Sequence, residues 1–341
     1  MIARSSYGKS LLVLLLLCLA FGCAAQKHET SALHQVGKTQ LPGVDGRIDH
    51  LAIDTKDKRL FIAALENNTI EAIDLKTDKR IGEIRGLKEP QGVAYVPETG
   101  RLIVTNGGGA SVGIYDDRTL QHIGDIQLGE DPDNVRYDAA AGRVYVGYGN
   151  GADSALGVID PKTDKKVASI QLSGHPESFQ LEKNGQRIFV NVPTSQAIEV
   201  VDRKKGAVVA NWPIKGASDN FPMALDNSDH RLFVGTRNPA RLRVLDTGTG
   251  KTVANLDSVG DADDIFYDGK TRRLYVSGGE GAVEVFQQKT PNDYKSIGET
   301  TTAKGARTSL FVPTSRMLYV AVPNYEVRQA QVRAFEVGSG E

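Results

Sequence analysis

One nine-residue segment recurs seven times along this chain, and its spacing constrains the fold more than any other feature. The segment reads RLIVTNGGG at Arg101, and its other copies begin at Arg59, Arg143, Arg187, Arg231, Arg273 and Met317. Successive copies start 42, 42, 44, 44, 42 and 44 residues apart. A fixed period in the range of roughly 40–50 residues indicates stacked supersecondary units rather than unrelated domains.

Each period contains the same strand-like segments. A run such as GVAYVP (92–97) precedes the nine-residue segment, an alternating run such as AIEVVD (197–202) follows it, and a run such as HIGDI (122–126) ends the unit. Alternation with a period of two is typical of a strand with two different faces. No segment after the N-terminal leader has a helical period of useful length. The sequence therefore predicts an all-β fold, a seven-bladed β-propeller with four antiparallel strands per blade.

The seventh unit is one strand short. It supplies SLFVP, MLYVAV and QVRAFE, after which the sequence ends. The segment QVGKTQL, from Gln35 to Leu41, is similar to HIGDIQL of the second unit. We therefore expect the N-terminal strand to complete the last blade, because this closure removes a free sheet edge.

Residues 1–25 have the pattern of a secretory signal peptide. Arg4 and Lys9 precede a short apolar run, and small residues surround Cys23. Cleavage after Cys23 would release a soluble protein. Cleavage before Cys23 would leave that cysteine available for lipidation, and the segment LAFGC resembles a bacterial lipobox with an unusual Phe21. Residues 26–34 are predicted to be a polar tether and residues 35–341 the propeller. We expect an exported protein of a bacterium, either periplasmic or a membrane-anchored lipoprotein.

Composition narrows the set of partners. Lys and Arg total 41 against 42 for Asp and Glu, so there is no strong positive field to attract nucleic acid. A membrane would be reached only through a lipid anchor. Both cysteines, Cys18 and Cys23, lie in the leader, so an intrachain disulfide is not expected in the mature chain, which we expect to be a monomer.

Several segments resemble a known repeat. They are the triplet VTN (104–106), the lead-in GEDP (129–132), and the pattern ID-x-KTDK at Ile73 and again at Ile159. These resemble the YVTN-type seven-bladed propeller repeat of exported bacterial and archaeal proteins, a WD40-like repeat. Other units have GYG, NVP or GTR in place of VTN. The resemblance spans nearly the whole mature chain and implies the fold, but it implies no activity, because the shared residues are structural.

The candidate binding residues stand just before the innermost strand of each blade, where ring symmetry would gather them at one mouth of the central channel. The predicted ligand-binding set is Asp49, His50, Gln91, Asp133, Asn134, Glu177, Asp263 and Arg307. Carboxylate oxygens suit Ca²⁺ or Mg²⁺, and the metal-ligand candidates are Asp49, Asp133, Glu177 and Asp263. In the alternative interpretation, these side chains accept backbone N–H groups at the tight loops or pair with Arg307.

The remaining polar residues leave the function open. His50 is either a base or metal ligand, or a hydrogen-bonded structural histidine, and His175 either faces the mouth or has a role in its own loop. The six arginines that begin the repeated segment are interpreted as packing residues. No catalytic constellation is recognisable, so no catalytic residue is assigned and no further cofactor is expected. The sequence favours a non-catalytic propeller that binds a partner protein, a small polar ligand or a cation at the mouth. The alternative is a metal-assisted hydrolase or lyase of the lactonase type that uses the same carboxylates.

Overall fold

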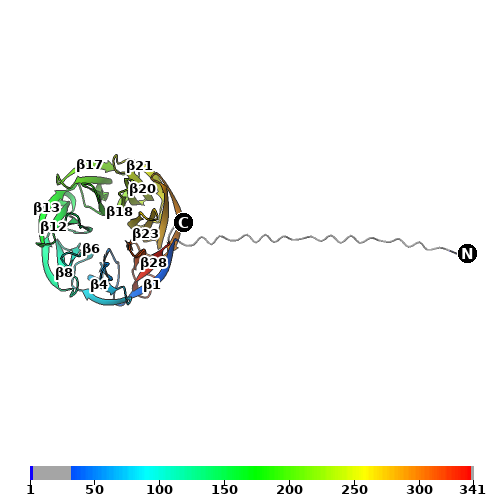
Figure 1. The fold of residues 1–341 in the computed structure, drawn as a ribbon, viewed down its shortest axis with the longest axis horizontal. Helices are drawn as coiled ribbons and strands as arrows, with labels where there is room; N and C mark the ends of the chain where they lie inside the picture. The colour runs from blue at the N-terminus through cyan, green and yellow to red at the C-terminus, as the bar shows by residue number, and fades with distance from the viewer. Residues whose placement is uncertain (3–31, 339–341) are drawn as a thin grey trace. The chain divides into compact units, whose positions relative to one another are not determined.

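The computed structural model describes residues 1–2 and 32–338. The predicted signal peptide, the lipidation site Cys23 and most of the predicted tether lie outside the described residues. Within 32–338 the chain forms seven four-stranded antiparallel sheets, arranged as blades around a central axis (Figure 1). The prediction of a seven-bladed all-β propeller is therefore confirmed.

The blades follow the sequence period, and their strands run outward from the axis in chain order. Blade 1 contains β2 (Leu51–Asp54), β3 (Arg59–Ala64), β4 (Thr69–Asp74) and β5 (Lys79–Ile84). Blade 2 contains β6 (Pro90–Val96), β7 (Arg101–Asn106), β8 (Ser111–Asp116) and β9 (His122–Gln127). Blade 3 contains β10 (Val135–Asp138), β11 (Arg143–Tyr148), β12 (Ala155–Asp160) and β13 (Lys165–Gln171).

The next three blades repeat this order. Blade 4 contains β14 (Phe179–Leu181), β15 (Arg187–Val192), β16 (Ala197–Asp202) and β17 (Ala207–Pro213). Blade 5 contains β18 (Ser218–Asp226), β19 (Arg231–Asn238), β20 (Ala240–Asp246) and β21 (Thr252–Asp257). Blade 6 contains β22 (Ala262–Asp268), β23 (Arg273–Gly278), β24 (Ala282–Thr290) and β25 (Asp293–Thr301).

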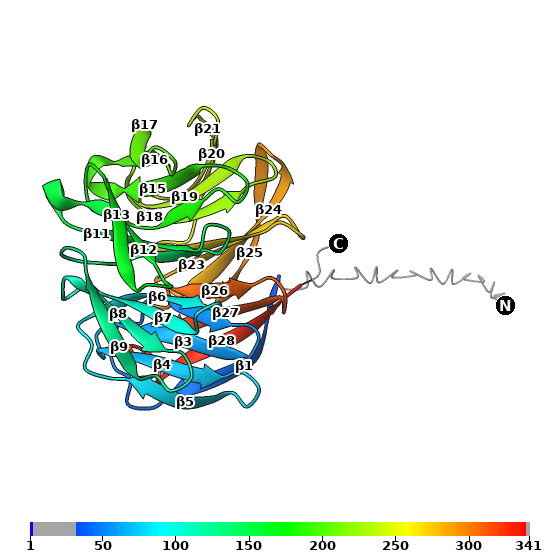
Figure 2. The ribbon, with the colours of Figure 1, turned by 60° about the vertical axis from the view of Figure 1, so that its left-hand side comes forward.

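Blade 7 joins the two ends of the propeller. It contains β26 (Ser309–Val312), β27 (Met317–Val322), β28 (Ala330–Val337) and, outermost, β1 (Leu33–Leu41), which pairs antiparallel with β28. Figure 2 shows β1 beside β28. The predicted closure is confirmed, with one difference: the strand begins at Leu33 rather than Gln35, because the buried Leu33 packs among apolar residues of blades 6 and 7.

Apolar clusters between neighbouring blades form the core. Phe61 of β3 and Leu102 of β7, for example, belong to one cluster and are both fully buried. The repeated nine-residue segment supplies the second strand of every blade, and its side chains are buried on both faces because each sheet has another sheet on either side. Helix is limited to two short 3₁₀ segments among the described residues, η1 (Gly151–Asp153) and η2 (Pro193–Ser195). No helix in the described chain has the length and apolarity to cross a bilayer.

The arginine that begins the second strand ties most blades to the next one. Arg59 of blade 1 donates to Asp117 of blade 2, and Arg273 of blade 6 donates to the Gly338 carbonyl at 3.1 Å. Equivalent contacts to the following blade are made by Arg101, Arg187 and Arg231. These contacts agree with the packing role inferred from their repetition.

Candidate functional site

The side chains at the channel mouth are positioned by a backbone pattern that repeats from blade to blade. The N–H of the residue at the mouth donates to the second strand of its own blade: Asp49 to Ala63 at 2.7 Å, and Glu177 to Asn191 at 3.0 Å. The carbonyl of the following residue accepts a bond back from the same strand, as His50 does from the N–H of Ala63 at 3.0 Å. Blades 1, 3 and 4 share this pattern, whereas Gln91 and Asp263 lie within the innermost strands β6 and β22 of their own blades.

The VTN triplet helps to fix the position of Asp133. The hydroxyl of Thr105, the middle residue of the triplet, donates to the Asp133 carbonyl at 2.7 Å and accepts the N–H of Gly92 at 2.7 Å. A Cβ at position 92 would lie 2.4 Å from that same carbonyl, so only glycine allows blade 2 to pack this closely against Asp133. The residues that carry the family resemblance thus hold a candidate ligand in place.

Two of the predicted carboxylates are neutralised by arginines. Arg47 lies 2.9 Å from Asp49 and 3.6 Å from Asp263, measured from its Nη2 to a carboxylate oxygen. Arg237 donates to the Asp263 carboxylate at 2.8 Å, and its guanidinium lies over the ring of Phe221 at 4.2 Å. Asp49 and Asp263 are thus engaged within the protein, and they are less suited to ligate a cation than the sequence suggested.

His50 lies between two carboxylates. Its Nε2 is 3.7 Å from Asp49, its Nδ1 is 3.6 Å from Asp264, and Asn134 contacts the ring at 3.3 Å. Burial alone would lower the pKa of His50, but the charges of Asp264 and Asp49 outweigh burial and raise the pKa to about 10. The imidazole is therefore protonated near neutral pH, which suits a buried ion pair and excludes a role as general base in the free protein.

Gln91 and Arg307 take partners at the edge of the mouth. Gln91 donates to Asp131 at 2.9 Å, and Arg307 pairs with Asp261 at 2.8 Å. The alternative in which Arg307 pairs with the predicted mouth carboxylates therefore does not describe the geometry. Gln91 and Arg307 border the mouth and leave its centre to other side chains.

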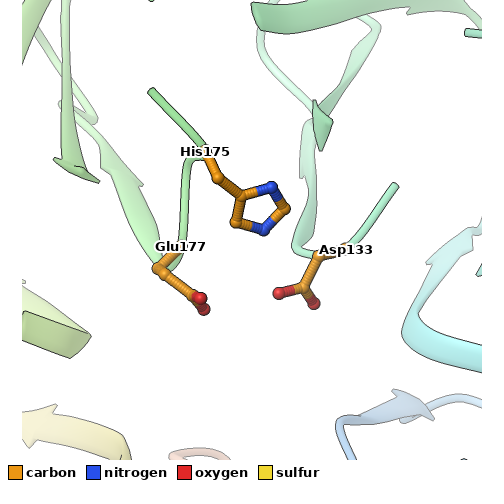
Figure 3. Close-up of side chains that lie close together, drawn as sticks. All are labelled: Asp133, His175 and Glu177. Atoms are coloured by element: carbon orange, nitrogen blue, oxygen red, sulfur yellow. The ribbon is translucent and has the colours of Figure 1, made fainter. Parts of the chain in front are cut away.

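Asp133 and Glu177 form the remaining part of the predicted set, and His175 joins them (Figure 3). One ligand atom from each of the three residues lies within 4.8 Å of the others. The Nδ1 of His175 lies 2.8 Å from the Gly149 carbonyl, which acts as the acceptor, so Nδ1 is the donor and Nε2 is the ring nitrogen left for a metal. The hydrogen bond from Nδ1 to the Gly149 carbonyl orients the ring in the way that is common for a metal-ligating histidine.

No cationic side chain contacts the carboxylates of Asp133 and Glu177 among the described residues. Within the described chain neither lies within 4.0 Å of a cationic side chain, and Asn134 contacts Asp133 only at 3.5 Å. Burial, reinforced by the charges of Glu177 and Asp49, raises the pKa of Asp133 well above its usual value. Burial, together with Asp263 and Asp49, raises the pKa of Glu177 to about 8. A bound cation would reverse both effects, because it favours the ionised carboxylate.

Asp133 and Glu177 were among the residues predicted from the sequence. The arginines that pair with the other two carboxylates, Asp49 and Asp263, were not predicted. Arg47 stands two residues before Asp49, and Arg237 is the penultimate residue of the long second strand of blade 5, so both were visible as charges without an assigned partner. His175 was considered for a loop role, and its position two residues before Glu177 was the available signal for a role at the mouth. The structure thus brings together Asp133, Glu177 and His175, with Asn134 and His50 adjoining them.

Comparison with known proteins supports the fold alone. No protein-family model matches the chain, and no curated protein sequence does. Among solved structures, Kuenenia stuttgartiensis hydrazine synthase matches with a TM-score of 0.75 and 20% sequence identity, over 87% of this chain and 99% of that one. Likeness at this level of identity establishes a shared propeller architecture and carries no activity across.

Proposed function

We propose that this protein is an exported, non-catalytic β-propeller that binds a divalent cation at the channel mouth and captures a small polar ligand or partner protein there. The observation that carries the proposal is the cluster of Asp133, His175 and Glu177, whose ligand atoms lie within 4.8 Å of one another. Two of the three are carboxylates whose pKa values are raised by burial and by neighbouring carboxylates. Export and membership of the YVTN-type repeat family remain part of the proposal, supported by residues 1–25 and by the VTN triplet.

The donor set favours a particular group of ions. Ca²⁺ and Mg²⁺ prefer oxygen ligands, whereas a set of one imidazole nitrogen and two carboxylates suits Zn²⁺, Mn²⁺ or a similar transition metal. Three protein ligands leave at least one coordination position for a water or a ligand atom. We therefore expect a ligand with an oxygen or nitrogen donor to complete the coordination.

A metal-assisted hydrolase or lyase of the lactonase type is the second candidate. It is favoured by the open coordination position, because a metal can lower the pKa of a water bound there. In the metal-free protein the neighbouring carboxylates favour the protonated form of His50, which does not suit a general base. Incubating the Zn²⁺-loaded and Mn²⁺-loaded protein with simple lactones separates the two: turnover lost in Asp133→Asn would establish the enzyme, and no turnover by a metal-bound protein would favour the binding role.

Titration calorimetry tests the proposed cation site. Wild-type protein, the double variant Asp133→Asn/Glu177→Gln and the control Asp125→Asn/Glu299→Gln, whose carboxylates are exposed, would each be titrated with Zn²⁺, Mn²⁺, Ca²⁺ and Mg²⁺. We expect one Zn²⁺ or Mn²⁺ per chain in the wild type and the control. The double variant should bind at least about tenfold more weakly, since losing even an outer-shell partner costs roughly 10–100-fold. Equal affinity in all three proteins, or no binding of any ion, would overturn the proposal.

A further inference from the structure

A second cavity lies inside the channel. Its volume is about 420 Å³, and the innermost strands or the residues just before them line it from all seven blades. Its walls combine aromatic and aliphatic side chains, including Tyr95, Tyr137 and Phe266, with polar ones such as Gln180. The proposed cation ligands Asp133, His175 and Glu177 do not line it, although His50 lines the cavity and adjoins those ligands.

Arg136 is the unusual residue of this cavity. Its guanidinium donates to the Val135 carbonyl at 2.9 Å and to the Ser178 hydroxyl at 3.4 Å, and it lies 5.7 Å from the centre of the Phe179 ring. Those are its only hydrogen bonds among the described residues, and no carboxylate there lies within 4.0 Å of it. A guanidinium has five N–H donors, so most of the hydrogen-bonding capacity of Arg136 is unused.

Three residues that line the cavity can carry a charge: His50, Arg136 and Asp264. His50 already has carboxylate neighbours, Asp49 at 3.7 Å and Asp264 at 3.6 Å. Asp264 is already engaged, since it faces His50 at 3.6 Å and accepts the N–H of Ser309 at 2.8 Å. Protein surrounds Arg136 closely enough for burial to lower the pKa of its guanidinium, although the side chain still touches the open space of the channel. Arginine stays charged at neutral pH, so the positive charge of Arg136 has no counter-charge in contact with it.

We infer that the channel cavity binds a small organic carboxylate, whose carboxylate pairs with Arg136 and whose apolar body packs against the aromatic and aliphatic walls. The planar fork of arginine matches a carboxylate in a bidentate geometry. A cavity of this size falls within the roughly 300–1,000 Å³ typical of small-molecule sites, which combine apolar walls with a few oriented polar groups. An aromatic carboxylate of the size of benzoate satisfies both requirements.

The test is a calorimetric titration of the full chain in EDTA, so that the cation site plays no part. Benzoate is the probe, benzyl alcohol is its uncharged analogue, and inorganic phosphate is an anion without an apolar body. The variants are Arg136→Gln, the charge-preserving Arg136→Lys, and the control Arg118→Gln, which alters an exposed arginine outside the channel.

We expect benzoate to bind the wild type and Arg118→Gln equally, Arg136→Lys more weakly, and Arg136→Gln at least about tenfold more weakly, the scale expected for one charge-assisted contact of about 1.5–3 kcal/mol. Benzyl alcohol and phosphate should bind the wild type less tightly than benzoate. If Arg136→Gln does not fold, this comparison of three probes on the wild type still decides the question. Phosphate binding more tightly than benzoate, benzyl alcohol binding as tightly, benzoate failing to bind, or Arg136→Gln retaining full affinity would overturn the inference.

Discussion

Among single residues, Asp133 and Glu177 stand apart because the protein places them near other carboxylates without a cation in contact. Asp133 is only 6% exposed, and its neighbours Asp49 and Asp263 already share Arg47. Holding two such groups together opposes folding unless they bind a proton or a cation. We therefore expect the stability of the protein to depend on both pH and bound metal.

Glu177 makes the stability of the metal-free protein depend on pH. Its pKa is about 8 in the folded protein, above its ordinary value of 4.5, so the native state binds more protons than the unfolded state between those values. The free energy of unfolding should therefore fall as pH rises from 4.5 to 8. His50 acts in the same direction between 6.5 and about 10.

Replacing Glu177 with Gln should remove part of this pH dependence. At pH 8.5 the variant should be more stable than the wild type, by something on the order of 1 kcal/mol, and at pH 5 the two should be similar. Urea denaturation at the two pH values measures the difference, with Glu299→Gln as the exposed control. If the free energy of unfolding falls equally with pH in the wild type and in the variant, the Glu177 carboxylate does not cause the pH dependence.

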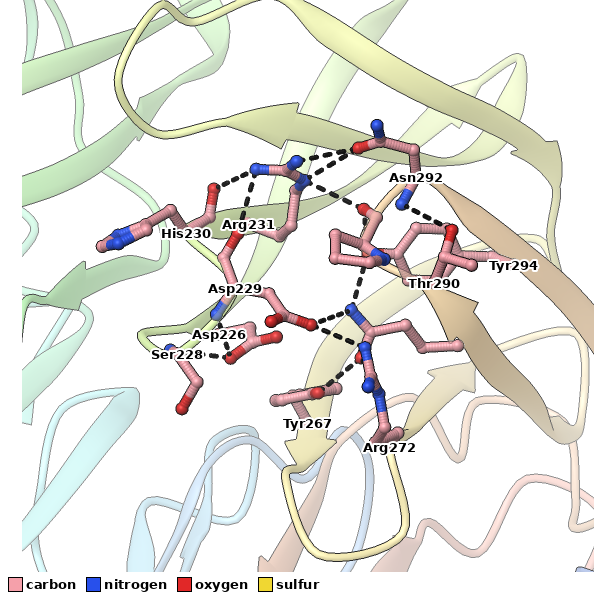
Figure 4. A network of polar contacts seen from close by, with 12 residues as sticks. Asp226, Ser228, Asp229, His230, Arg231, Tyr267, Arg272, Thr290, Asn292 and Tyr294 are labelled. Atoms are coloured by element: carbon pink, nitrogen blue, oxygen red, sulfur yellow. Dashed lines mark hydrogen bonds and ion pairs between the residues drawn. The ribbon is translucent and has the colours of Figure 1, made fainter.

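Between structural elements, the arginines of the repeated strand hold neighbouring blades together. Figure 4 shows the junction of blades 5 and 6, where Arg231 donates to the Pro291 carbonyl at 2.9 Å and to the Asn292 side chain at 2.8 Å. In the same network Arg272 pairs with Asp229 at 2.6 Å. These bonds supplement the apolar clusters between the sheets.

Arg231→Gln should therefore destabilise the protein more than Arg143→Gln. Arg143 is a matched control, because its described contacts, to Asp160 and the Gly142 carbonyl, stay within its own blade. We expect Arg231→Gln to lower the free energy of unfolding by about 1–3 kcal/mol and Arg143→Gln by less than about 0.5 kcal/mol. Midpoints of guanidinium denaturation give the comparison, and equal midpoints for the two variants would contradict a role in joining blades.

Strand β1 provides the second test at this scale. Leu33 and Leu41 at its two ends are buried, and eight of its residues pair with β28. A chain that starts at Pro42 should melt at least several degrees lower than a chain that starts at Ala32, because blade 7 loses its outer strand and exposes an edge. Thermal unfolding followed by circular dichroism distinguishes them. Equal melting temperatures would mean that the N-terminal strand does not close the ring.

At the scale of the whole molecule, a cation at the mouth would join blades 3 and 4, since Asp133 precedes β10 and both His175 and Glu177 precede β14. Metal that binds only the folded state stabilises it by about 2.7 kcal/mol at a hundredfold excess over Kd. We expect Zn²⁺ or Mn²⁺ to raise the melting temperature of the wild type more than that of Asp133→Asn/Glu177→Gln. An identical shift in both proteins would place the ion elsewhere.

The sequence was sufficient to predict the ring but only part of the site. Seven blades and the closure by residues 35–41 followed from spacing, because each repeat needs a neighbour to bury its faces. Which carboxylates remain free depends on contacts between blades. Arg47 contacts Asp263, which is more than 200 residues away in the sequence. An alignment of the repeats compares equivalent positions, so it does not predict a contact between two different positions of distant repeats.

The cation site is tested most directly by anomalous diffraction from crystals grown with Zn²⁺ or Mn²⁺. We expect an anomalous peak about 2.0–2.2 Å from a carboxylate oxygen of Asp133, a carboxylate oxygen of Glu177 and the Nε2 of His175. Crystals in which the ion scatters at other positions, while the space between these three side chains shows no anomalous signal, would contradict it.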